Sequence, residues 1–140
     1  MSAYPQGVTY DGIAVGDSLP AVTSAPISRT TLALFAGASG DHNPIHVDID
    51  FAKAAGMPDV FAHGMLGMAY LGHLLTAWVP QRAVREFSTR FVAITQVHAI
   101  VTCTGRVVEK RDGNLVALKI EAADQHGEVK LAGKALVQLP

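Results

Sequence analysis

The sequence lacks cysteine pairs, an excess of basic residues and the pattern of a signal peptide. Its 140 residues include one cysteine, Cys103, so no intrachain disulfide can form, which fits a reducing compartment such as the cytoplasm. Lysine and arginine number 11 against 12 aspartates and glutamates, and without a basic excess we expect no nucleic-acid partner. The first residues have no basic segment followed by an apolar run, so we expect no signal peptide. We expect a single cytoplasmic domain over residues 1–140.

Charged residues are also scarce, at 16% of the chain, whereas hydrophobic residues make up 49%. So rich a core in a small protein predicts that part of the apolar surface is buried against a second chain. The longest apolar run covers residues 62–79 and ends at Pro80. Because it is apolar nearly all round, it predicts a buried helix. Its two histidines, His63 and His73, would be costly in lipid, so we expect no membrane span.

Short-range patterns predict the other elements. Ser28 is a good N-cap for a helix over residues 29–38, and Asp48 or Asp50 can begin a short helix that Gly56 ends. After residue 86 the pattern changes to that of strands. The candidate strands cover residues 87–94, 98–109, 115–124 and 129–139, with hairpin turns at residues 112–114 and 125–127. We therefore predict an α+β fold in which an antiparallel β-sheet wraps around one long central apolar helix.

A polar turn separates the first helix from the short one. Gly40 weakens the helix and Pro44 ends it. On a straight helix Asp41 and His46 would point about 140° apart, but a bend at Pro44 lets them converge. A carboxylate and an imidazole facing one small volume can hold and activate a water molecule. The same residue types also build ordinary turns, so both interpretations stay open from this pattern alone. We expect His46 to lie on the polar turn rather than in the core.

A metal site is an alternative use of the same residues. His42 and His46 are four residues apart, with Asp41 adjacent and His63 downstream. Zinc binding by such a pair requires both histidines on one face of a helix. Pro44 lies between them and disrupts that face, so we expect no metal.

Three segments resemble one protein family. Ser39-Gly40-Asp41-His42-Asn43-Pro44-Ile45-His46 resembles the hydratase-2 signature of the MaoC-like dehydratases, or (R)-specific enoyl-CoA hydratases. Residues 62–66 resemble the start of the family's central helix, and residues 132–137 resemble its closing strand. The resemblance covers nearly the whole chain. It implies a hot-dog fold and a hydro-lyase of fatty-acid metabolism that interconverts trans-2-enoyl and (3R)-3-hydroxyacyl thioesters.

The resemblance also implies roles for individual residues. The family's catalytic aspartate and histidine fall on Asp41 and His46, either of which can serve as the base. The residues that position the substrate and stabilise the oxyanion fall on Asn43 and Gly64, and the Gly64 N–H would face the thioester carbonyl. His63, in contrast, is expected to be a structural residue of the helix's first turn. The candidates for lining the acyl pocket are Phe61, Met65 and Met68.

Two other functions fit the same fold. A hot-dog thioesterase would release free thiol from acyl-CoA and would not need the pair Asp41 and His46. A supporting subunit of a heterodimeric dehydratase would assist an active partner. For the leading hypothesis, the substrate is a thioester of coenzyme A or of acyl carrier protein, with no further cofactor. The resemblance implies a homodimer, and a heterodimer with a second hot-dog subunit is the alternative.

Overall fold

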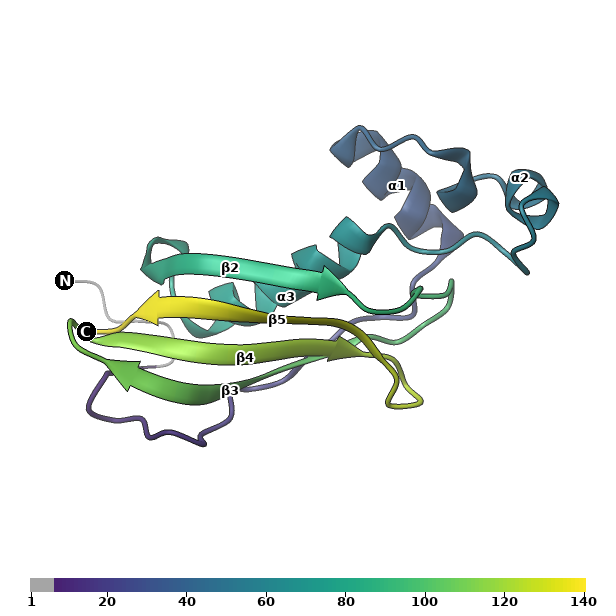
Figure 1. The fold of residues 1–140 in the computed structure, drawn as a ribbon. Helices are drawn as coiled ribbons and strands as arrows, with labels where there is room; N and C mark the ends of the chain where they lie inside the picture. The colour runs from purple at the N-terminus through teal and green to yellow at the C-terminus, as the bar shows by residue number, and fades with distance from the viewer. Residues whose placement is uncertain (1–6) are drawn as a thin grey trace.

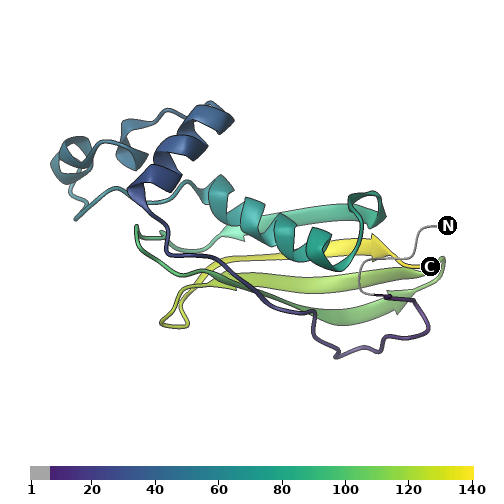
Figure 2. The same ribbon diagram turned by 180° about the vertical axis from the view of Figure 1, so that it is seen from behind.

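An antiparallel sheet of five strands carries one long helix across one face (Figures 1 and 2). The structure is a computed structural model that describes residues 7–140, so the first six residues of the expected domain lie outside the described residues. The strand order is β1-β3-β4-β5-β2, which places β1 and β2 at the two edges. The strands are β1 (Val22–Thr23), β2 (Val84–Phe91), β3 (Thr102–Arg111), β4 (Leu115–Ala123) and β5 (Val129–Gln138).

The helices begin where the sequence provides caps. Ser28 accepts a hydrogen bond from the Thr31 N–H, and Asp48 accepts from the Asp50 and Phe51 N–H groups, so both predicted caps are confirmed. Figure 2 shows that α1 and α2 lie beyond the N-terminal end of α3. The helical elements are α1 (Arg29–Ser39), the 3-10 helix η1 (Pro44–His46), α2 (Ile49–Ala54), α3 (Gly64–Trp78) and the 3-10 helix η2 (Gln81–Ala83).

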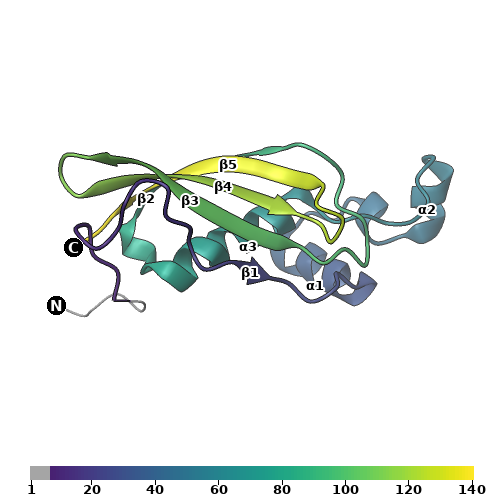
Figure 3. The same ribbon diagram turned by 90° about the horizontal axis from the view of Figure 1, so that it is seen from below.

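Helix α3 packs against the sheet along one side, as Figure 3 shows from below. A Cβ atom on Gly67 would lie 2.6 Å from Leu131 Cδ1, so glycine is what allows this close approach. The prediction that the whole helix is buried is wrong for the single chain, because the sheet covers only one side of it. The exposed side is a stripe at helical spacing, which we call the α3 stripe: Met65, Ala69, His73 and Thr76.

Two strand boundaries differ from the prediction because long-range contacts set them. Strand β2 covers Val84–Phe91 rather than residues 87–94, since the N–H groups of Val92 and Ala93 both donate to the Lys130 carbonyl. Strand β3 begins at Thr102 rather than at residue 98, because His98 has a φ of 71° and donates its N–H to Ile27. The hairpin turn at residues 112–114 is confirmed.

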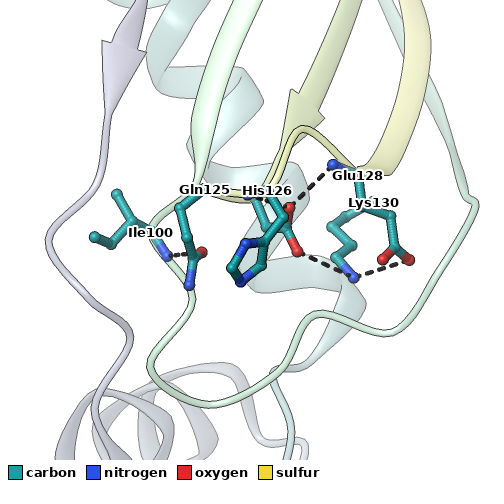
Figure 4. A network of polar contacts seen from close by, with 6 residues as sticks. Ile100, Gln125, His126, Glu128 and Lys130 are labelled. Atoms are coloured by element: carbon teal, nitrogen blue, oxygen red, sulfur yellow. Dashed lines mark hydrogen bonds and ion pairs between the residues drawn. The ribbon is translucent and has the colours of Figure 1, made fainter.

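The β4–β5 hairpin contains a network of polar contacts around a buried lysine (Figure 4). The Lys130 side chain is 5% exposed, and its Nζ lies 3.6 Å from Asp124 Oδ2 and 3.1 Å from Glu128 Oε1. Asp124 Oδ1 accepts from the N–H groups of His126 and Glu128, at 2.9 and 3.0 Å. Burial acts to raise the pKa of Asp124, but these two hydrogen bonds and Lys130 hold it below its ordinary value.

This hairpin also anchors the connection between β2 and β3. Gln125 Oε1 accepts from the Ile100 N–H at 3.0 Å (Figure 4). The Lys130 carbonyl accepts from the N–H groups of residues 92 and 93. The connection in turn pairs with the chain that leads into α3, because Ala62 donates its N–H to the Thr95 carbonyl at 2.9 Å. The hairpin thus supports the segment just before Gly64.

The ends of the described chain meet at the other end of the sheet. The Tyr10 N–H donates to the Pro140 carbonyl at 2.9 Å. None of the helices within residues 7–140 has both the length and the apolar character needed to cross a lipid bilayer.

Candidate active site

The turn between α1 and η1 is built from side chains that bond to its own backbone. Helix α1 ends at Ser39 and is capped by Gly40, which has a left-handed φ of 78°. The Asp41 N–H then donates to Ser39 Oγ, and the Asn43 N–H donates to Asp41 Oδ1, both at 3.2 Å. Asn43 Oδ1 accepts from the Ile45 N–H at 3.2 Å and so caps η1. Asn43 therefore holds the Asp41 carboxylate through its backbone, while its side chain shapes the turn.

His46 ends η1 and points into the protein. Its side chain is only 9% exposed, so the expectation that it lies outside the core is wrong. Its Nδ1 lies 2.7 Å from the Phe61 carbonyl oxygen, and since a carbonyl only accepts, Nδ1 carries the hydrogen. In the neutral ring, Nε2 then has the free lone pair. This contact selects the tautomer in which Nε2 can take a proton.

His63 occupies the position just before α3 and was expected to be structural. It is 1% exposed, and its ring stacks on that of His46 with centroids 3.9 Å apart and 27° between planes. Its Nε2 lies 3.2 Å from the Asp41 carbonyl oxygen and donates to it. The structure therefore brings His63 into the same cluster as Asp41 and His46. The sequence held one signal for this: Ser, Thr, Asp or Asn usually cap a helix, and histidine is uncommon there.

The three side chains converge closely. One oxygen of Asp41 and one ring nitrogen each of His46 and His63 lie within 4.8 Å of one another. Burial lowers the pKa of His63, and the nearby His46 lowers it further, against the raising effect of Asp41. His63 is therefore neutral at pH 7. The two nitrogens and one oxygen are also a donor set that a divalent metal can use. His42, which the sequence-based metal hypothesis included, is exposed and is not in the cluster.

Gly64 opens α3 as predicted. As the first helical residue it has an N–H without an intrahelical partner, at the positive end of the helix dipole. The ring of Phe91 covers this residue, because a Cβ on Gly64 would lie 3.0 Å from two carbons of that ring. A cavity of about 320 Å³ adjoins Gly64 and Phe91.

The three candidates for the acyl pocket lie in two different hollows. Phe61 lines the cavity beside Gly64. Met65 and Met68 line a second, larger hollow of about 510 Å³ that also contains Asp41. Two apolar hollows therefore adjoin the first turn of α3.

Comparisons with known proteins agree on one family. A family model described as "MaoC like domain" matches residues 12–129. The (R)-specific enoyl-CoA hydratase of Rhodospirillum rubrum is 32% identical over 137 residues, which cover 94% of this chain and 91% of that protein. The fatty acid synthase subunit beta of Saccharomyces cerevisiae is 30% identical over 131 residues. That match covers 91% of this chain but only 6% of the yeast subunit.

The fold has a close counterpart among solved structures. An R-hydratase from Pseudomonas aeruginosa in its unliganded form superimposes with a TM-score of 0.86 at 28% identity. The superposition covers 94% of this chain and 85% of the other. The curled antiparallel sheet with its one long helix is the hot-dog fold that the sequence predicted.

Proposed function

Because this chain belongs to the MaoC-like dehydratase family, whose members include hydratases and dehydratases, we propose that it hydrates trans-2-enoyl thioesters. The product is the (3R)-3-hydroxyacyl thioester, and the same site runs the reverse dehydration. The observation that carries this proposal is the contact of His46 Nδ1 with the Phe61 carbonyl, which leaves a basic Nε2 in the cluster with the Asp41 carboxylate. Such a pair can bind and deprotonate water.

The proposed reaction needs only a proton shuttle. Asp41 and His46 hold one water molecule between them, and its oxygen bonds to C3 of the substrate as one of its protons passes to the pair. The electrons of the C2–C3 double bond move toward the thioester carbonyl. The pair then delivers a proton to C2 on the same face. One water is added in total, and no electron donor or acceptor takes part.

The charge that develops on the thioester oxygen requires a donor. We assign this role to the Gly64 N–H, which lies in the first turn of α3. A single donor of this kind changes kcat by about 10²- to 10³-fold in other enzymes. Asn43 contributes by positioning, since its backbone N–H bonds to the Asp41 carboxylate.

The two hollows suggest that the acyl chain and the thioester of the substrate bind in different places. In the proposed arrangement, the acyl chain lies against Met65 and Met68, beside Asp41. The thioester lies toward Gly64, with Phe61 and Phe91 around it. The thioester is carried by coenzyme A or by acyl carrier protein.

We propose that no metal or other cofactor takes part, although the cluster has suitable donor atoms. The chemistry above moves only protons, which a carboxylate and an imidazole can do unaided. Exhaustive treatment with EDTA should therefore leave the hydration rate unchanged. A loss of activity that added zinc restores would contradict this part of the proposal.

A homodimer fits two features of the single chain. Strand β2 is an edge of the sheet, and the α3 stripe beside it is open, with Met65 53% exposed. A second copy meeting this edge would extend the sheet and cover both stripes. Light scattering on the purified protein should give twice the chain mass. A heterodimer partner is indicated if the chain alone is monomeric.

The single cysteine takes no part in the proposed chemistry. Cys103 is buried, and burial raises its pKa to about 11. It therefore stays a protonated thiol, which is compatible with a cytoplasmic setting.

The test uses the purified chain with crotonyl-CoA and then with longer trans-2-enoyl-CoAs. We expect loss of the absorbance of the conjugated thioester without release of free thiol. Thiol release would identify a thioesterase and overturn the proposal. No reaction with coenzyme A or carrier-protein substrates, followed by activity when a second subunit is added, would identify a supporting subunit.

A further inference from the structure

One buried nitrogen lacks the hydrogen bond that buried polar atoms normally have. Within residues 7–140, His63 Nδ1 is the buried side-chain nitrogen or oxygen without a partner. The imidazole that carries it is 1% exposed. Leaving such an atom unpaired costs more free energy than one neutral hydrogen bond returns. The unpaired Nδ1 therefore lowers the stability of the fold, so the presence of a histidine at this position needs another explanation.

The contacts of this ring lead to the two residues of the proposed proton shuttle. Its Nε2 donates to the Asp41 carbonyl at 3.2 Å, across 22 positions of sequence. Its face stacks on His46 at 3.9 Å. On the other side, Phe35 of α1 contacts it edge-on at 4.9 Å. Asp41 and His46 are the titratable groups that act on it.

We propose that His63 is a positioning residue for the hydration, which holds the Asp41 backbone and the His46 ring in the geometry that binds water. This inference rests on the proposed function. His63 itself exchanges no proton with the substrate, because the ring is enclosed by protein.

The location of His63 allows it to fix the exposed turn that carries Asp41 to a rigid helix. Asp41 lies on an exposed turn held by local hydrogen bonds, while His63 lies at the start of α3. The contact from Nε2 thus connects the turn to the helix that carries Gly64. Displacing a reacting group by about 1 Å can cost about 10²-fold in rate, so this connection bears directly on kcat.

Three variants test the proposal. His63→Phe keeps an aromatic ring for stacking and removes both ring nitrogens, so it loses the bond to Asp41. His63→Gln keeps a donor near the position of Nε2. His126→Phe is the matched control, because His126 is an exposed histidine that lies outside both the Asp41 cluster and the α3 stripe. Each is assayed for hydration of crotonyl-CoA and melted thermally, and amide hydrogen exchange is followed at Asp41 and Asn43.

We expect His63→Phe to lower kcat about 10- to 100-fold, with KM changed by less than about threefold. Its melting temperature should equal or exceed that of the wild type, and exchange at Asp41 and Asn43 should become faster. His63→Gln should recover most of kcat, and His126→Phe should match the kcat of the wild type.

Two results would overturn the proposal. One is a kcat for His63→Phe within twofold of the wild type. The other is a parallel fall of kcat and melting temperature in both His63 variants, which a purely structural residue would give. If the wild type hydrates no enoyl thioester, the proposed function itself fails. An active wild type with an equally active His63→Phe variant refutes the positioning role alone.

Discussion

The turn at residues 41–46 and the hairpin at residues 124–130 both gather polar side chains, but they use them differently. In the hairpin, the Asp124 carboxylate accepts two backbone N–H groups and also pairs with buried Lys130. In the turn, one Asp41 oxygen accepts from Asn43, and the other has no partner within residues 7–140. His46 likewise uses Nδ1 and leaves Nε2 open.

Under the proposed function, this difference separates polar groups that stabilise the fold from polar groups that react. A carboxylate with all its hydrogen bonds made inside the protein has nothing left to offer a substrate. A carboxylate and an imidazole that each keep one open position can bind water between them. Substitutions in the turn should therefore affect rate, and substitutions in the hairpin should affect stability.

The largest expected effect is on rate, from Asp41→Asn. The amide cannot accept a proton from water, so kcat should fall about 10³-fold. Its oxygen can still accept from the Asn43 N–H, so the melting temperature should stay within about 2 °C of the wild type. Crotonyl-CoA hydration and a thermal melt measure the two quantities. A stable variant that keeps its activity would remove Asp41 from the mechanism.

The opposite pattern is expected for Lys130→Met in the hairpin. Asp124 would lose its buried cation, so the free energy of unfolding should fall by roughly 3 kcal/mol, which lowers the melting temperature by about 10 °C. At 25 °C kcat should stay within about threefold. Lys119→Met, at an exposed lysine on β4, is the control and should change stability by less than about 0.5 kcal/mol. If Lys130→Met loses activity without losing stability, the comparison between the two regions does not hold.

The smallest expected effect is on the pH dependence of stability. Because the pKa of His63 is lowered mainly by burial, the unfolded chain binds the His63 proton more readily than the folded chain. The free energy of unfolding should therefore fall as pH drops below about 6.5, with a slope of at most about 1.4 kcal/mol per pH unit from this group. Urea titrations between pH 5 and 8 should show that His63→Phe removes this part of the slope. An unchanged slope would mean that His63 is not held neutral by the fold.

Local sequence signals predicted those parts of the fold that local contacts determine. Ser28, Asp48 and Gly113 lie where short-range hydrogen bonds or a positive φ set the boundary, and those elements were located correctly. The ends of β2 and β3 were misplaced because they depend on partners distant in sequence. The Lys130 carbonyl, for example, accepts hydrogen bonds from the N–H groups of residues 92 and 93, and no local pattern encodes these contacts.

The residues of the candidate site also fall into those that a local motif predicts and those that only the tertiary fold brings together. Asp41, Asn43 and His46 lie within one short motif, and the sequence grouped them. His63 reaches them only through the packing of α3 against the turn, which brings its ring onto His46. The burial of His46 was missed for the same reason, since its partner is the Phe61 carbonyl. Contacts of this kind depend on the tertiary fold.

Because Tyr10 and Pro140 are hydrogen-bonded to each other, the described chain enters and leaves the fold at one point. Figure 1 shows the marked C-terminus at the end of the sheet opposite α1 and α2, where the Asp41 turn lies. A unit whose ends are adjacent can be inserted into a surface loop of a larger host polypeptide without stretching either partner. Gene fusion can therefore reuse this fold as a module, since the junctions lie at the opposite end of the sheet from the candidate site. In the yeast synthase subunit, the stretch similar to this chain is 6% of the whole.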